Sequence, residues 1–338
     1  MQPRQSVRQT IVLKQPPRVA GWASLAGRFE GQGPLGDSFD RIVDDLHGGK
    51  TWEQSESRMM EDAVHLCLEK YGHALTDVDL MFAGDLLNQI VSANFAARQL
   101  ALPFFGLFSA CAVSAEAMAL GAMLIDSGHF ERIMVATASH HLTAERQYRF
   151  PIEFGVQRLP TQAWTATGAV AVLLAAAGTE FSGPRLTALT TGVVTDLGIK
   201  DPNHMGAAMA PAAAGTIAAH LQAMNEKPGD YDMILTGDLG RAGKPLLDHV
   251  LMEDHGISLG ERLHDAGIEL YDAKQDVHSG GSGPACSALV LAARVLPGLQ
   301  SGELKRVLFV ATGSLHSPTT YQQGESVPGI AHAVCLEA

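Results

Sequence analysis

The chain of 338 residues carries 24 basic and 36 acidic side chains, for a net charge of −12, and 46% of its residues are hydrophobic. This charge argues against a nucleic-acid partner, because proteins that bind nucleic acids present basic surfaces. No apolar run reaches the roughly 18 residues that a membrane span needs, and residues 1–9 lack the apolar core of a signal peptide. The four cysteines show no paired spacing and the histidines no zinc spacing, so we expect a reducing compartment, no metal and no cofactor.

Hydrophobic spacing predicts strands and helices in alternation along the first half of the chain. In order, these are strands at 10–13 and 18–22, helices at 39–46 and 55–71, a strand at 78–83, a helix at 90–100, a strand at 104–108, a helix at 112–126 and a strand at 132–138. Residues 139–164 are predicted to be irregular and to form a cap over a pocket, with His140, Arg146 and Arg149 among its basic residues. Long structureless loops in compact domains are often functional, although a solvated loop is the alternative.

The pattern then begins again after a buried strand at 167–177. The second half is predicted to contain strands at 186–194 and 233–236, a helix at 208–225, helices at 245–253 and 284–296, and strands at 306–311 and 329–336. Residues 77–86 (DVDLMFAGDL) match 230–239 (DYDMILTGDL), and residues 127–139 match 301–314 in the same order. These matches indicate a duplicated α/β unit, which we divide into halves at 1–180 and 185–338.

Cys111 lies between the predicted strand at 104–108 and the helix at 112–126. The free N–H groups and positive end of a helix favour a thiolate, so Cys111 is either a nucleophile or the floor of an anion pocket. The other interpretation is a small buried core residue. The duplication gives this turn a counterpart at Gly281 and Ser282, where a glycine-rich turn opens the helix at 284–296. Two helix N-termini are therefore expected to converge on one site that favours negative charge.

Residues 109–112 (SACA) resemble the nucleophile elbow of the thiolase-like superfamily of β-ketoacyl and chalcone synthases, and residues 165–173 resemble its next buried strand. The resemblance implies a duplicated αβαβα fold of five layers and, usually, a homodimer. Residues 150–155 (FPIEFG), 162–168 (QAWTATG) and 275–283 (QDVHSGGSG) further resemble the stage V sporulation protein AD family of spore-forming bacteria. That resemblance implies binding of dipicolinic acid and help in moving it into the developing spore.

A condensing enzyme of this superfamily also needs a His in a His-x-x-Asn motif and an Asn in a Gly-Asn turn, which stabilise the enolate and oxyanion. At the equivalent places the chain has Gly-Asp-Leu-Gly at 237–240 and Gly-Ser-Gly at 281–283, so both donors are absent. We interpret Asp238 as a helix cap or turn residue in the first instance, because its repeat counterpart Asp85 supports that role. Cys335 and Cys286 lack the Cys-x-Gly context of thiolases and are interpreted as packing residues.

The sequence therefore predicts a binding protein for dipicolinic acid on a thiolase-like fold that has lost catalysis. Calcium is one way to offset the charge of the ligand. One alternative is an acyltransferase or condensing enzyme that uses Cys111 with rearranged donors such as His278 and Ser282. Another is a structural partner of the other stage V sporulation A membrane proteins, which would hold a soluble chain at the spore inner membrane. The candidate ligand-binding residues are Cys111, His278, Ser282, Gly281, His316, Asp238, His140, Arg146 and Arg149.

Overall fold

The computed structural model describes residues 8–149, 158–178 and 182–338. Its strands are β1 (Thr10–Val12), β2 (Arg18–Gly27), β3 (Arg41–Val43), β4 (Leu80–Gly84), β5 (Phe104–Gly106), β6 (Arg132–Ser139), β7 (Trp164–Thr165), β8 (Gly168–Ala175), β9 (Arg185–Thr190), β10 (Met233–Thr236), β11 (Leu263–Asp265), β12 (Gly281–Ser282), β13 (Arg306–Ser314) and β14 (Gly329–Glu337).

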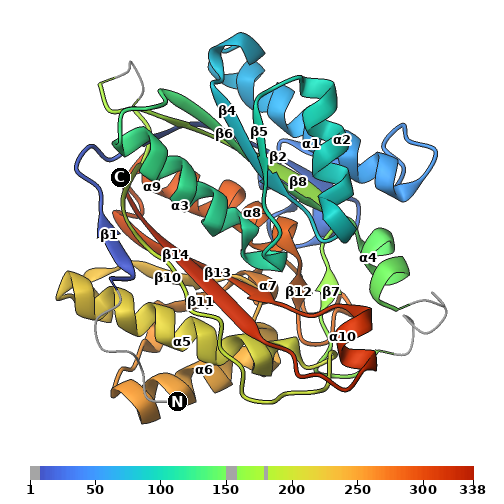
Figure 1. Cartoon of the computed structure of the whole chain (residues 1–338), viewed down its shortest axis with the longest axis vertical. Helices are drawn as coiled ribbons and strands as arrows, with labels where there is room; N and C mark the ends of the chain where they lie inside the picture. Colours follow the sequence, from blue (N-terminus) through green and yellow to red (C-terminus); the bar gives the residue numbers. More distant parts are fainter. Residues whose placement is uncertain (1–7, 150–157, 179–181) are drawn as a thin grey trace.

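The helices alternate with these strands along the chain, as the sequence predicts (Figure 1). They are α1 (Trp52–Tyr71), α2 (Val91–Leu100), α3 (Val113–Asp126), α4 (His141–Tyr148), α5 (Met205–Met224), α6 (Gly240–His255), α7 (Ala266–Glu269), α8 (Pro284–Val290), α9 (Leu296–Ser301) and α10 (Pro318–Gln322). A π-helical turn at Leu291–Val295 joins α8 to α9. None of the helices in the described residues has both the length and the apolar character that a membrane crossing requires.

Within the described residues, twelve strands form one sheet with two halves of matching order. The first half runs β2-β8-β6-β4-β5 and the second runs β9-β14-β13-β10-β11, with β2 and β9 joined by the single pair Arg18–Arg185. The repeated sequences occupy equivalent places, because β4 matches β10 and β6 matches β13 in this order. The chain boundaries at 180 and 185 stay a prediction, since both halves contribute to the same sheet.

The helices lie in three layers around the two halves of the sheet. Side chains alternate along each strand, so Phe82 on β4 faces the middle of the molecule whereas Met81 faces the outside. α1 and α2 pack on the outer face of the first half, and α5 and α6 pack on the outer face of the second half. α3 and the α8–α9 segment fill the middle. This arrangement is the five-layer αβαβα fold that the sequence predicts.

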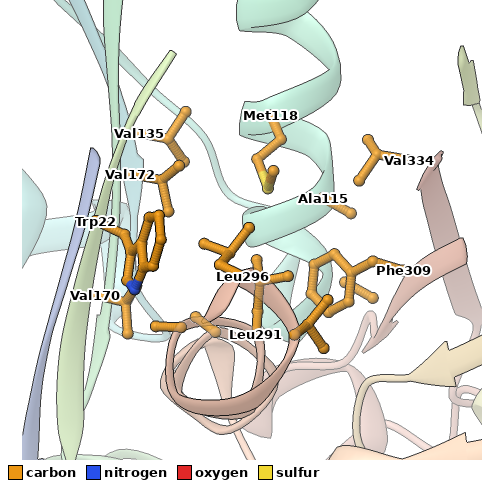
Figure 2. Close-up of a cluster of buried hydrophobic side chains, with 14 of the residues drawn as sticks. Trp22, Ala115, Met118, Val135, Val170, Val172, Leu291, Leu296, Phe309 and Val334 are labelled. Carbon is orange, nitrogen blue, oxygen red and sulfur yellow. The ribbon is translucent and has the colours of Figure 1, made fainter. Parts of the chain in front are cut away.

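The middle layer forms a core that both halves share (Figure 2). Trp22 and Val170 face the central helices from one half of the sheet, and Phe309 faces them from the other. Between them lie Met118 of α3 and Leu291 at the end of α8, both almost fully buried. Because α3 begins at the Cys111 turn and α8 begins just after Ser282, the packing of this layer sets the relative position of the two turns.

Two predicted elements differ in the structure. The helix predicted at 39–46 is wrong, because residues 41–43 form β3, which pairs in parallel with β2. The irregular stretch predicted at 139–164 contains α4, which begins after His140 and is mostly polar, with few buried residues to set a helical spacing. The structure also contains β11 and α7, which the sequence did not predict. The motif at 150–155 lies outside the described residues.

Candidate functional site

Cys111 lies in a tight turn between β5 and α3. Ala110 has a φ of 53°, in the left-handed region that alanine rarely adopts, and a short 3-10 turn leads into the helix. Two glycines make room for this backbone. A Cβ on Gly84 would lie 2.2 Å, and one on Gly313 2.5 Å, from a carbonyl oxygen of residues 107–109. A side chain at either glycine would therefore displace the turn that positions the thiol.

A buried polar cluster lies against this turn. The Cys111 Sγ is 3.8 Å from the Ser282 Oγ, which donates a hydrogen bond of 2.9 Å to the Asp238 Oδ2. The Thr312 hydroxyl donates to the Asp238 Oδ1 over 2.6 Å, and the Gly283 N–H donates to the Oδ2 over 3.2 Å. The two helix-opening turns therefore meet, and the carboxylate of Asp238 holds the second turn in place.

Burial and charge keep the Cys111 thiol protonated. The side chain is enclosed by protein, and this desolvation raises its pKa well above the usual value; the negative charge of Asp238 raises it further. The expectation that the start of the helix favours a thiolate is therefore wrong, because desolvation and the carboxylate outweigh the helix N-terminus. Burial also raises the pKa of Asp238, against the effect of its hydrogen bonds from Thr312 and Ser282.

Asp238 has the turn role that we expected in the first instance, but at the turn before α8, where it accepts the Gly283 N–H, and it does not cap α6, the helix that follows it in the chain. Asp265 has the capping role here, since it accepts hydrogen bonds of 2.9 to 3.2 Å from backbone N–H groups at the start of α6 and in α7. The repeat counterpart Asp85 does bind its own turn, through the N–H groups of Leu87 and Ala93. The two aspartates therefore differ in role despite their equivalent positions.

A cavity of about 410 Å³ adjoins the cluster, within the range of small-molecule sites. Cys111 and Ser282 contribute to its lining from the two turns. A row of three rings also lines the cavity. His316, which follows β13, lies in the middle, and its ring centroid is 5.6 Å from that of Tyr148 in α4 and 6.0 Å from that of Tyr321 in α10. Each phenol donates a hydrogen bond to a backbone carbonyl, which fixes the rings. The walls are therefore aromatic and the cluster side is polar.

Arg149 supplies a guanidinium to the same cavity. It pairs with Glu145 one helical turn earlier, and the Gln162 amide oxygen, when it faces the guanidinium, accepts from it as well. Burial raises the pKa of Glu145 and lowers that of Arg149. Burial also lowers the pKa of His316, with a further contribution from the positive Arg149, so the imidazole is neutral at neutral pH.

The structure brings only part of the predicted set to the cavity. Cys111, Ser282, His316 and Arg149 line it, and Asp238 lies behind the first two. The remaining predicted residues lie elsewhere.

Gly281 packs against Tyr271 and Cys286 in the core, and Cys286 is fully buried, as expected of a packing residue. His140 is buried and its Nε2 lies 2.8 Å from the Asp45 carbonyl oxygen. The side chains of Arg146, His278 and Cys335 do not line the cavity either. Arg146 pairs with Glu53, His278 lies 3.1 Å from Asp276, and Cys335 is buried in β14.

Several cavity residues were missed by sequence reasoning. Tyr321 comes from a five-residue helix with no buried residue, and Asn203 comes from an irregular segment before α5, so neither carries a periodic signal. Glu145 could have been found, because it stands four residues before Arg149 on a helix and opposite charges at that spacing pair.

The family model of stage V sporulation protein AD matches residues 7–337 of the chain. Stage V sporulation protein AD of Bacillus subtilis (strain 168) is 45% identical over 331 residues, which are 98% of this chain and 97% of that protein.

Two solved structures of other proteins are similar over almost the whole chain. A single-residue variant of Xanthomonas campestris OleA has a TM-score of 0.61 at 16% identity, covering 97% of this chain and 100% of that one. The 3-oxoacyl-[acyl-carrier-protein] synthase III of Aquifex aeolicus VF5 has a TM-score of 0.57 at 15% identity, covering 95% and 100%. At these identities the likeness shows the fold alone, and that fold is thiolase-like.

Proposed function

Because the chain belongs to the stage V sporulation protein AD family, we propose that it binds dipicolinic acid (pyridine-2,6-dicarboxylate) and assists its uptake into the developing spore. The observation that carries the proposal is the cavity beside the Cys111 turn. It combines a guanidinium, a row of aromatic rings and a polar face made by two helix-opening turns. These are the groups that a planar ring with two carboxylates requires.

The ligand has a part for each of these groups. Arg149 would bind one carboxylate, because a guanidinium has five N–H donors and Glu145 and Gln162 use only some of them. The rings of Tyr148, His316 and Tyr321 would pack against the pyridine ring. The second carboxylate would meet the turn at Cys111, where the chain enters α3.

The same cluster is poorly suited to acyl transfer by Cys111, which is the alternative function. A nucleophilic cysteine reacts as a thiolate, and here burial and Asp238 raise its pKa. Ser282 already donates its hydroxyl hydrogen to Asp238, and His278 does not line the cavity. These features support binding over reaction.

Calorimetric titration with dipicolinate tests the proposal, with pyridine-2-carboxylate as the matched ligand that lacks one carboxylate. We expect saturable dipicolinate binding and at least tenfold weaker binding of the monocarboxylate. A second titration with dipicolinate premixed with calcium shows whether the chelate or the free acid is preferred. Incubation with acetyl-CoA or malonyl-CoA, followed by mass spectrometry of the Cys111 peptide, tests the alternative. Turnover through acyl-Cys111 without dipicolinate binding would overturn the proposal.

We also propose a homodimer through β5, which ends the strand order of the sheet. Phe105 on this strand and Phe108 just after it are 59% and 56% exposed. An edge strand with large apolar side chains favours pairing with a second copy. Light scattering after size exclusion should give twice the chain mass for the wild type and the monomer mass for Phe105→Asp. A wild-type monomer would rule the dimer out.

Association with the spore inner membrane is proposed to depend on the other stage V sporulation A membrane proteins. Co-expression with those proteins should bring the chain into detergent-solubilised complexes. Failure of the chain to enter these complexes would contradict the proposal.

A further inference from the structure

A second cavity, of about 520 Å³, lies between α1 and α2, on the outer face of the first half of the molecule. We call it the α1–α2 groove. The two helices lie beside one another in Figure 1, and their groove-lining residues recur at helical spacing. The lining residues that matter for its chemistry are Lys50, Ser57, Arg58, Ser92, Phe95 and Arg98.

Three cationic side chains line the groove without an ion-pair partner among the described residues. Only the backbone N–H of Lys50 is bound, to the Gln54 side chain. Arg58 donates a hydrogen bond to the carbonyl oxygen of Gly48. The Arg98 guanidinium lies over the Phe95 ring, 4.5 Å from its centroid. The groove also contains two carboxylates. One, Glu53, is paired with Arg146 of α4, and the other, Glu61, accepts from the Ser57 hydroxyl over 3.4 Å. The groove therefore gathers unpaired positive charge on a chain of net charge −12.

The start of α2 adds a hydroxyl to this charge. The backbone there is already bound, because the buried Asp85 carboxylate accepts from the Ala93 N–H in the first turn of α2. Ser92, in the first turn, is 1% exposed, lines the groove, and its hydroxyl has no hydrogen-bond partner among the described residues. A buried hydroxyl without a partner is costly, so it marks a place where a bound group supplies the missing bond.

We propose that the α1–α2 groove binds a phosphate group. Two guanidiniums, an ammonium and a free hydroxyl provide more donors than one carboxylate can use. Phosphate has three acceptor oxygens and up to two negative charges, which match this set. Phe95 is 47% exposed beside the cations, so the group attached to the phosphate can pack on its ring. The site is separate from the dipicolinate cavity, with which it shares no lining residue.

The phosphate has two possible sources, a soluble phosphate ester or a phospholipid headgroup. Titrations of the full chain with inorganic phosphate and with AMP report the first. Flotation with vesicles of phosphatidylcholine, with and without phosphatidylglycerol, reports the second. Binding in either arm supports the site, and the arm in which it occurs identifies the source.

Three variants assign the binding to the groove. The double variant Arg58→Gln/Arg98→Gln should bind at least tenfold more weakly, and Ser92→Ala should bind several-fold more weakly. Arg262→Gln is the matched control, because it removes an exposed arginine from the 3-10 turn just before β11, in the other half of the sheet. It should bind like the wild type. Circular dichroism should show all of them folded.

Two results would overturn the proposal. One is a wild-type chain that binds neither phosphate, AMP nor the anionic vesicles. The other is a double variant that binds as well as Arg262→Gln. Dipicolinate affinity is measured on the same samples and should be unchanged by the groove variants, so failure of the groove and failure of the dipicolinate site give different results.

Discussion

Replacement of Arg149 by Gln tests the dipicolinate site most directly. Gln keeps much of the side-chain length but removes the positive charge and most of the donors. A hydrogen bond to a charged group contributes about 1.5–3 kcal/mol, and a tenfold change in affinity corresponds to about 1.4 kcal/mol. One lost charge-assisted contact therefore predicts dipicolinate binding roughly 10- to 100-fold weaker. The buried Glu145 loses its partner in this variant and would also repel the ligand, so the upper part of this range is expected.

Arg146 offers a matched control on the same helix. It lies one turn earlier, pairs with Glu53 outside the cavity and lies over the Trp52 ring at 5.1 Å. Arg146→Gln should change the calorimetric dissociation constant less than twofold. The double variant Glu145→Gln/Arg149→Gln removes both charges and separates the loss of the cation from repulsion by the carboxylate. Wild-type affinity in that folded double variant would refute the role of the guanidinium.

Three further predictions concern protonation and the turn. Burial lowers the pKa of His316, and a bound dianion favours its protonated form, so binding should take up protons. Dipicolinate affinity in titrations should therefore rise as the pH falls from neutral into the acidic range, and His316→Gln should lose this dependence. Iodoacetamide should react with Cys111 only at alkaline pH, as measured by mass spectrometry of the Cys111 peptide. Asp238→Asn should speed this reaction at a given pH. Equal rates in the wild type and the variant would show that the carboxylate has no effect on the thiol. Gly313→Ala should lower the free energy of unfolding in urea by about 1–3 kcal/mol, because the new Cβ meets the carbonyl oxygen of Ser109. Gly215→Ala is the control, since a Cβ at this position of α5 meets no atom within 4 Å. Equal urea midpoints for the two variants would contradict the contact between Gly313 and the Cys111 turn.

The architecture could be predicted because its main elements have strong and repeated patterns. The matches of 77–86 with 230–239 and of 127–139 with 301–314 correspond to strands at equivalent positions in the two halves of the sheet. β3 was mistaken for a helix because it has only three residues, of which two are exposed, so it shows no strand pattern of buried and exposed side chains. α4 was not predicted because it is short and mostly polar. It lines a cavity and does not pack on a core, so its sequence has no apolar helical spacing.

The candidate site could be predicted where it follows from the duplication. Cys111 and Ser282 each lie at a turn that opens a helix of the shared middle layer, and this relation is visible in the sequence. Tyr321 reaches the cavity from a segment distant in sequence, and no local pattern reports such a contact. The repeat suggested that Asp238 would bind its own turn as Asp85 does. It binds the turn before α8 instead, and a separate residue, Asp265, caps α6 and α7.

The shared middle layer has a consequence for synthesis of the chain on the ribosome. The inner faces of β6 and α3 are complete once the first half has emerged, but the α8–α9 segment that covers them follows more than 100 residues later. Until then Met118 and Val135 remain uncovered, and exposed apolar surface of this kind promotes aggregation. We expect the nascent first half to need a chaperone. The pocket floor, which combines Cys111 with Ser282, forms only when translation is nearly complete.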